Sequence, residues 1–556
     1  MFFNYCRVAW RNISRQKLFS FINIFGLALS MSIGLIVLVR LKDELGTDRF
    51  HPNGNRIYRV ISQVTNKQHN TFRLASSPIP VATELQKNNA FIEAATTLYP
   101  AWNGKADANK KQINVSTVFI EPSFFKVFGF KTLSGKNNDL QAPNTAVITK
   151  DLANRFFGST NPVGQTIQMG KLGTFLVVDV MQPAPGRSHI EYDAYLSFSS
   201  ITLLQKNNIL SWQAGDWNPT YGYTYVLLSE GTSEKKLASA LDRIASSINK
   251  SQAADAGTLS FDTQSLLSIS PGEELQFSIG NVATTGKVTA EIAIALIILL
   301  SACFNYTNLS IARALKRAKE VGIRKVNGAS RHSIFLQFLV ESIIISLLSL
   351  VLSGIIFSFL KEYAPFSREM IPPNIKVDGQ LILWLALFSL GTGTVAGTIP
   401  ALILSAFNPV QVLKNLANVK LFGRNGFRKA LTVIQFSLSL VIIIFMMTAS
   451  RQFKYMATAD YGFNRNNILS VPLQGADYSL LKTEIAKVGG VQRVAGLSDY
   501  PGWSASGTIM MKPLPAADGI KMGFFDVDEN YLPNLQLQLL AGKNFTGATT
   551  DDERDV

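Results

Sequence analysis

The sequence predicts a helical membrane protein that carries α+β domains outside the membrane. Of its 556 residues, 47% are hydrophobic and only 16% are charged, which is a balance typical of membrane proteins. Five apolar segments are each long enough, at about 20 residues, to cross a bilayer. Two long polar regions follow the first and the fifth of them. The net charge of +15 is concentrated beside the apolar segments, so we attribute it to cytoplasmic loops and expect no nucleic-acid binding.

The chain begins with a basic segment, residues 1–17. Phe3, Cys6, Trp10 and Ile13 recur at helical spacing, and arginines repeat every four residues on another face. A helix of this kind suits the lipid surface of the cytoplasmic leaflet, which makes membrane lipid an expected partner. A plain helical extension of the first span is the alternative.

The spans and the segments between them follow in order. No small-residue cleavage site follows the first span, so we expect an uncleaved anchor. Short basic loops place the N-terminus, the second-to-third loop and the fourth-to-fifth loop in the cytoplasm. The predicted segments are transmembrane spans 18–42, 290–311, 334–360, 381–405 and 430–450, cytoplasmic segments 312–333 and 406–429, an outer loop 361–380, and outer domains 43–289 and 451–556.

The first outer region, 43–289, is large enough for a core of its own. Short β-branched runs predict strands, and apolar residues at helical spacing predict helices between them. The mixture indicates an α+β domain. The predicted strands are 56–61, 145–149, 174–180 and 223–228, and the predicted helices are 80–87, 150–157 and 234–249.

The chain also repeats itself at long range. Residues 121–125 with 133–137 recur as 529–533 with 540–544, an offset of 529 − 121 = 408. Each copy follows an apolar span, so we interpret the repeat as a span followed by an outer domain. Because the second copy occupies only residues 451–556, we expect the chain to be a fragment whose remainder holds the rest of that domain and three further spans.

No constellation typical of an enzyme is present in the sequence. Cys6 and Cys303 lie outside the large polar regions, and the four histidines show no ligand spacing, so we expect neither disulfides nor a metal. Residues 129–136 resemble a phosphate loop, but five residues separate the glycines and Asn137 follows where Ser or Thr is needed. A turn lysine is the better interpretation. We therefore expect no catalytic residue and no cofactor on this chain.

Polar residues inside the spans are candidate functional residues. Asn305 and Asn308 lie late in the second span, and Glu341 lies about two turns into the third. A proton relay needs ionisable groups in sequence across the membrane, and this pattern offers too few. Hydrogen bonding between helices is the favoured interpretation.

The segment 312–333 is the most basic short stretch of the chain. It holds one acid, Glu320, and its cations are Arg313, Lys316, Arg317, Lys319, Arg324, Lys325 and Arg331. This charge exceeds what orienting a span requires, which predicts contact with a partner. A solvated loop flanking the membrane is the alternative.

Residues 317–331, RAKEVGIRKVNGASR, followed by QFLVES at 337–342, resemble the signature of the MacB/FtsX-type permeases of ABC transporters. The resemblance extends to NYTNLS at 305–310 and to Pro409. The layout is similar to an eight-span variant with two outer domains.

The resemblance implies a permease that pairs with a separate cytoplasmic ATPase, which holds the ATP and magnesium. It implies docking of the segment 312–333 on that ATPase as a helix, so that approach of two ATPase subunits moves the first two spans and the outer domain. Glu320 and Arg324, four residues apart, can pair on one helix face, leaving Arg317, Lys325 and Arg331 toward an acidic groove. The candidate coupling residues are Arg317, Lys319, Glu320, Gly322, Arg324, Lys325, Gly328 and Arg331.

Further partners that the resemblance implies are a second permease copy or paralogue, a periplasmic adaptor and an outer-membrane channel, at the bacterial inner membrane. We expect export or extraction of a peptide, lipoprotein or drug. One alternative is a regulator that relays the ATPase state to a cell-wall enzyme or sensor without transport. Another is a receptor that works without an ATPase.

Overall fold

The chain forms two compact units in a computed structural model, Met1–Phe445 and Met446–Val556. The structure describes residues 2–66, 69–133, 140–210, 217–251, 257–364, 371–372, 375, 377–407, 424–473, 476–498, 507–511 and 520–544.

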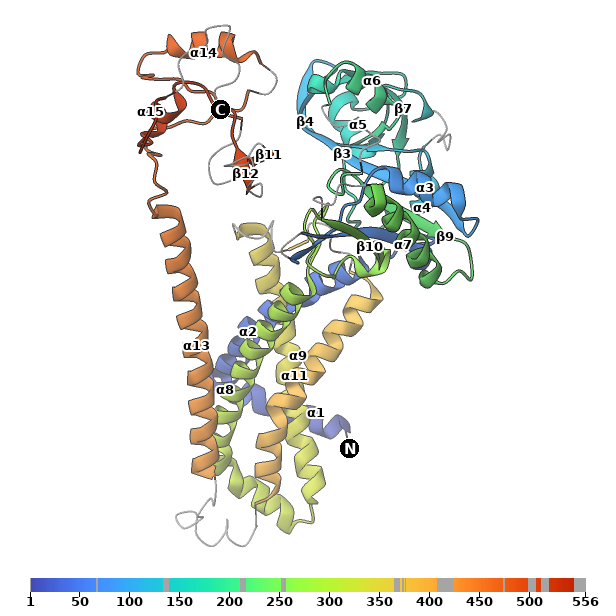
Figure 1. Cartoon of the computed structure of the whole chain (residues 1–556). Helices are drawn as coiled ribbons and strands as arrows, with labels where there is room; N and C mark the ends of the chain where they lie inside the picture. Colours follow the sequence, from blue (N-terminus) through green and yellow to red (C-terminus); the bar gives the residue numbers. More distant parts are fainter. Residues whose placement is uncertain are drawn as a thin grey trace. The chain divides into compact units, whose positions relative to one another are not determined.

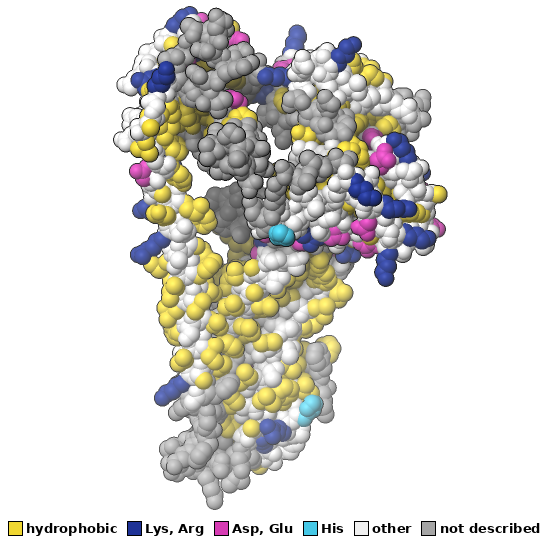
Figure 2. All heavy atoms as spheres, viewed as in Figure 1, with side chains coloured by type: hydrophobic (Ala, Val, Ile, Leu, Met, Phe, Trp, Pro, Cys, Tyr) yellow, Lys and Arg dark blue, Asp and Glu magenta, His cyan; other side chains and the backbone are white. Residues whose placement is uncertain are grey.

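Among the residues that the structure describes, five helices are long and apolar enough to cross a membrane, in agreement with the five predicted spans. Figure 2 shows hydrophobic side chains gathered over the helical part of the molecule and charged ones mostly over its α/β part. The five helices, drawn in Figure 1, are α2 (Lys17–Gly46), α8 (Thr285–Val326), α9 (Arg331–Tyr363), α11 (Gly379–Ser405) and α13 (Arg424–Thr458).

The second span and the basic segment after it are one continuous helix, α8. The sequence divides them at residue 311 because the apolar run ends there. Residues 312–321 are rich in Ala, Leu, Arg, Lys and Glu, which are strong helix formers. The helix therefore continues beyond the apolar run and ends only before Asn327 and Gly328.

Small side chains let the third and fourth spans approach closely. A Cβ on Gly397 would lie 1.8 Å from the Ser342 Oγ atom. One turn further along α9, the Ser346 hydroxyl donates to the Ser389 carbonyl oxygen of α11 at 2.8 Å. The expectation of close packing from the glycines of the fourth span is thus confirmed.

A separate helix, α1 (Phe2–Arg15), precedes the first span, and the chain turns at Gln16. It lies against the start of α9, where the Tyr5 hydroxyl contacts the Ser333 hydroxyl at 2.8 Å. Phe3 and Trp10 are exposed. The break at Gln16 favours the amphipathic helix over a plain extension of span one.

An α+β domain, residues 47–284, is inserted between α2 and α8, and we call it the inserted domain. Its strands form one mixed sheet in the order β10-β1-β9-β3-β4-β8-β5-β7-β6, with β2 paired to β1. The strands are β1 (Ile57–Thr65), β2 (Thr71–Leu74), β3 (Ile92–Ala108), β4 (Lys111–Ile120), β5 (Thr145–Thr149), β6 (Thr166–Gln168), β7 (Thr174–Met181), β8 (Ala194–Ser197), β9 (Tyr223–Leu228) and β10 (Thr258–Ser265).

The long strand β3 connects two lobes of this domain. Its first part pairs with β9, and its second part pairs with β4. Helices α3 (Pro80–Asn88) and α7 (Glu234–Ser251) pack over the first lobe, while α5 (Lys150–Phe157) and α6 (Ser200–Lys206) pack over the second (Figure 1). A third core lies around α4 (Ser123–Phe128).

The second unit preserves the order of elements that the repeat predicts. Its hairpin β11 (Gly507–Met511) and β12 (Ile520–Phe524) is followed by the short helix α15 (Tyr531–Leu535). In the inserted domain, β3 and β4 precede α4 in the same way, and the helix starts differ by 531 − 123 = 408. The structure therefore supports the repeat. Helix α14 (Tyr478–Ala486) lies before the hairpin.

Candidate functional site

The predicted coupling residues lie on a helix–turn–helix formed by the end of α8 and the start of α9. Gly328 has a φ of +93°, a left-handed conformation that side chains disfavour. The Ser330 hydroxyl then accepts a hydrogen bond from the Ser333 backbone N–H at 3.1 Å and caps α9. The turn is therefore built by Gly328 and Ser330, and we call this region the coupling end.

One face of the α8 end packs into a small core. Ala318 and Val321 are buried against Ile334 and Phe338 of α9 and against Leu404 of α11. Gly322 is also buried. This packing fixes which face of the basic helix is free.

Several predicted coupling residues form contacts within the chain. Arg317 forms a two-pronged ion pair with Glu341, with both N–O distances at 2.9 Å. Glu341 also accepts a hydrogen bond from Asn12 of α1 at 3.2 Å. Arg324 pairs with Glu320 at 2.6 Å, as the spacing predicts, and also donates to the Gln337 side chain.

Lys325 is held at the end of a neighbouring helix. Its ammonium donates to the carbonyl oxygens of Ser405 and Phe407, each at 2.7 Å. A cation at a helix C-terminus satisfies carbonyls that lack helical partners. The prediction that Arg317 and Lys325 face outward is therefore wrong, because both are bound within the chain. Arg331 is exposed, as predicted. The Lys319 side chain lies outside the part that the structure describes.

The exposed face of the coupling end is partly apolar, which the sequence analysis missed. Ile323 is 49% exposed and Val326 is 64% exposed. They lie three residues apart on α8, opposite the packed Val321. Their spacing within a charged stretch is the signal that could have revealed them, because exposed apolar residues framed by charge typify protein contacts.

Of the three candidate polar residues inside the spans, Asn308 and Glu341 join helices. Asn308 donates to the Thr432 hydroxyl of α13 at 3.3 Å, and Glu341 joins α8, α9 and α1 as described above. These contacts agree with the favoured interpretation of hydrogen bonding between helices. Asn305 lines a cavity of 250 Å³ between α2, α8 and α13, together with Asn23 and Gln435.

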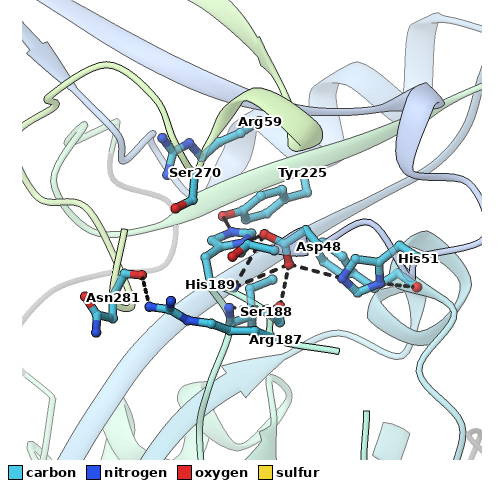
Figure 3. A network of polar contacts seen from close by, with 12 residues as sticks. Asp48, His51, Arg59, Arg187, Ser188, His189, Tyr225, Ser270 and Asn281 are labelled. Atoms are coloured by element: carbon cyan, nitrogen blue, oxygen red, sulfur yellow. Dashed lines mark hydrogen bonds and ion pairs between the residues drawn. The ribbon is translucent and has the colours of Figure 1, made fainter. Parts of the chain in front are cut away.

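The inserted domain is tied to α2 and α8 by a second group of polar contacts, which we call the junction. Arg187 donates to Asp43 at 2.8 Å and to Glu44 at 2.9 Å. It also donates to the Asn281 carbonyl oxygen at 3.0 Å (Figure 3). The Ser270 hydroxyl donates to the other Glu44 oxygen at 2.9 Å. One arginine therefore connects the end of the first span to the segment leading into the second.

Two further contacts hold the two span ends together. Arg40 of α2 forms an ion pair with Glu291 of α8 at 3.1 Å. The backbone N–H of Thr285, at the start of α8, donates to the Gly272 carbonyl oxygen of the inserted domain at 2.8 Å. Both spans thus enter the domain at one place.

A buried carboxylate completes the junction. Asp48 accepts hydrogen bonds from the Ser188 hydroxyl at 2.6 Å and from the His189 ring Nδ1 at 2.6 Å, and the His51 ring Nε2 lies 3.3 Å from the carboxylate. The Asp48 backbone N–H donates to the Arg187 carbonyl oxygen at 2.9 Å. Figure 3 shows Asp48 between the two imidazole rings, with Tyr225 beyond His189.

The protonation states of this group follow from its surroundings. Burial opposes ionisation of Asp48, but the polar contacts with His189, His51 and Ser188 outweigh it and hold the pKa of the carboxyl well below its usual range. Burial lowers the pKa of His189 despite the carboxylate. Hence Asp48 is ionised and His189 is neutral, donating from Nδ1 to Asp48 and accepting at Nε2 from the Tyr225 hydroxyl at 2.6 Å.

The comparisons with known proteins match the two parts of the first unit separately. Residues 20–244 match the family model of the MacB-like periplasmic core domain, and residues 292–409 match the FtsX-like permease C-terminal model. The first match covers α2 and most of the inserted domain. The second covers α8, α9 and α11, including the coupling end.

Curated relatives show the same combination. The chain is 24% identical to "Uncharacterized ABC transporter permease YknZ" of Bacillus subtilis over 315 residues, which are 56% of this chain and 72% of that protein. It is 26% identical over 283 residues to the "Macrolide export ATP-binding/permease protein MacB" of Bdellovibrio bacteriovorus, covering 48% of this chain and 38% of the relative. The chain thus spans less than half of this MacB relative.

Two solved structures are also similar to part of the chain. A domain of a permease protein from Porphyromonas gingivalis is 21% identical, with 39% of this chain and 91% of the domain covered, at a TM-score of 0.32. The periplasmic region of MacB from Actinobacillus actinomycetemcomitans is 18% identical with the same coverage, at a TM-score of 0.28. On the two family models and the named relatives, the chain belongs to the ABC transporter permeases of the MacB/FtsX type.

Proposed function

We propose that this permease couples ATP hydrolysis on a separate cytoplasmic ATPase to movement of its periplasmic domain. The chain contributes no ATP chemistry of its own, and the ATP and magnesium belong to the ATPase. The movement drives export or extraction of a substrate such as a peptide, lipoprotein or drug at the inner membrane. A second permease copy or paralogue, a periplasmic adaptor and an outer-membrane channel are the further partners that this function calls for.

The observation that carries the proposal is the continuity of α8. Its 42 residues correspond to a length of about 63 Å at 1.5 Å per residue. One end begins at the junction, and the other end forms the coupling end. A displacement of the coupling end therefore moves the base of the inserted domain without an intervening hinge.

Contacts at the coupling end support transmission to the neighbouring helices. Arg317 links α8 to α9, and Lys325 links α8 to the end of α11. Arg313 of α8 donates to Gln16 at 3.0 Å and lies 4.0 Å above the Phe19 ring at the start of α2. A force on the α8 end is thus shared by the spans that enter the inserted domain.

A substitution that tests ATPase docking must leave the contacts within the chain intact. Reversing Arg324 or Lys325 would also break their contacts to Gln337 and α11, so loss of binding would have two explanations. Val326 is exposed and takes no part in the packed core. We expect Val326→Asp to reduce co-purification of the ATPase by about tenfold, as for a central interface residue.

Val377→Asp is the matched control. Val377 is 74% exposed and precedes α11 at the opposite end of the spans, so its substitution leaves ATPase binding unchanged. Equal co-purification of the ATPase with both variants would contradict docking at the coupling end.

Transport of a candidate substrate in vesicles then separates export from a purely regulatory role.

A further inference from the structure

A cavity of 820 Å³ lies beside the junction, where the spans meet the inserted domain. Its walls come from the end of α2, the start of α8 and α11, and loops of the inserted domain. This volume falls in the range of small-molecule sites, about 300–1,000 Å³. The cavity is lined by the apolar side chains of Val39, Ile371 and Leu381, by Glu191 and Lys287, and by paired charges.

One part of the wall is apolar and belongs to the spans. Val39, Ile371 and Leu381 are each less than 9% exposed. Val39 lies near the end of the apolar run of α2, and Leu381 lies in the first turn of α11. These side chains mark the height at which the hydrocarbon region of a bilayer ends.

The other part of the wall is charged, with four cations and four carboxylates. Three of the cations already have carboxylate partners. Lys42 pairs with Asp378 at 2.6 Å, and the ion pairs of Arg40 and Arg187 are those described at the junction. These pairs hold the wall in place.

Glu191 and Lys287 form no ion pair within 4.0 Å among the residues that the structure describes. Both side chains are exposed on the wall of the cavity. The cavity thus offers one carboxylate and one ammonium that are available to a ligand. A ligand that carries charges of both signs can pair with both side chains at once.

We propose that this cavity binds the head group of a zwitterionic phospholipid of the outer leaflet, such as phosphatidylethanolamine. The lipid ammonium contacts Glu191, the phosphate contacts Lys287, and the first carbons of the acyl chains lie against Val39 and Leu381. Charge-assisted hydrogen bonds of this kind are the stronger ones in proteins. The lipid would join α2, α11 and the inserted domain at a place where the junction already connects α2 and α8.

The test uses the full chain in nanodiscs with a phosphatidylethanolamine that carries a photoreactive group near its head. We expect labelled peptides from residues 184–191 and 281–287. Unlabelled phosphatidylethanolamine should compete about tenfold better than phosphatidylglycerol, which has the phosphate but no ammonium.

Two substitutions separate the contributions of the charges. Glu191→Gln should bring the two competitors to within about twofold of each other, because the ammonium loses its carboxylate. Lys287→Gln should weaken both competitors by about threefold to tenfold, because both carry a phosphate. Glu230→Gln and Lys236→Gln, at exposed positions of the inserted domain, are the controls and leave labelling unchanged.

Unfolding midpoints of all four variants show whether the fold is preserved. Equal competition by the two lipids in the unsubstituted protein would overturn the proposal. So would an unchanged lipid preference in Glu191→Gln, or displacement of the probe by an acylated peptide in preference to phosphatidylethanolamine. None of these measurements requires the ATPase, so they are independent of the proposed coupling function.

Discussion

At the residue scale, the coupling end depends on an ion pair that the sequence only half predicts. Glu341 is visible in the sequence as a lone acid inside a span. Its partner Arg317 lies 24 residues earlier, in a stretch of many cations. The turn at Gly328 and Ser330 determines which of those cations lies beside Glu341. The packing of α8 against α9 sets this turn, and the spacing of residues along one helix does not reveal it.

Glu341→Gln should destabilise the helical part of the protein by roughly 2–3 kcal/mol, because Arg317 remains mostly buried without its carboxylate. Unfolding midpoints in detergent micelles measure this. Glu320→Gln is the control, since its pair with Arg324 is more exposed and contributes about 0.2–0.5 kcal/mol. The double variant Arg317→Met/Glu341→Met should recover most of the loss, and an equal loss in Glu341→Gln and Glu320→Gln would refute the structural role of the pair.

The buried pair at the junction predicts a pH dependence. The folded state keeps His189 neutral, so the unfolded chain takes up a proton below its ordinary pKa of 6.5 that the folded chain does not. Stability therefore falls as the pH decreases below about 6.5, and the contribution of this residue to the slope is limited to about 1.4 kcal/mol per pH unit, the value for one proton. The lowered pKa of Asp48 adds its own loss of stability only below about pH 4.

His189→Asn keeps a donor toward Asp48 but removes the titration. Below about pH 6.5, the slope of the unfolding free energy against pH should become smaller, by up to about 1.4 kcal/mol per pH unit. His69→Asn, at an exposed position, serves as the control and leaves the slope unchanged. A slope that is the same in His189→Asn and the unsubstituted protein would show that His189 is charged in the fold.

At the element scale, strongly patterned segments were predicted well and weakly patterned ones were missed. The strands β5 and β9 and the helix α5 have the bounds that the sequence predicts. Strand β3 was missed because Pro100 and Gly104 interrupt its pattern. It stays extended because β9 and β4 pair with its two parts, and a bulge between Pro100 and Trp102 absorbs the irregularity.

One backbone position decides whether the junction can close. Gly280 has a φ of +70°, and a Cβ there would lie 1.8 Å from the His189 carbonyl oxygen. Gly280→Ala should therefore destabilise the inserted domain by about 2 kcal/mol more than Gly231→Ala. Gly231 has a φ of +73° with open space around it, so that variant has the backbone strain alone, about 1–2 kcal/mol.

Thermal unfolding of the two glycine variants, in the same detergent, compares them directly. Hydrogen exchange at residues 184–191 locates the change, which should appear in Gly280→Ala and not in Gly231→Ala. Equal effects of the two substitutions would mean that the close approach at His189 relaxes without consequence.

At the scale of the first unit, the sequence predicted the spans, their order and the basic coupling segment from hydropathy and charge. It could not predict the junction, because Arg187 and its partners Asp43 and Glu44 lie more than 140 residues apart. It also divided α8 in two. The junction and the continuity of α8 together connect the coupling end to the periplasmic domain.

Hydrogen exchange in the full chain bound to its ATPase tests that connection most directly. We expect that trapping the ATPase with ATP and vanadate changes exchange at the junction, in residues 184–191 and 270–283. The change should persist in Val377→Asp. It should be lost in Arg187→Ala, which still binds the ATPase but lacks the contacts to Asp43, Glu44 and Asn281. Hydrogen exchange at the junction that is the same with and without vanadate trapping would contradict transmission through α8 and the junction. So would a change in exchange that is still present in Arg187→Ala.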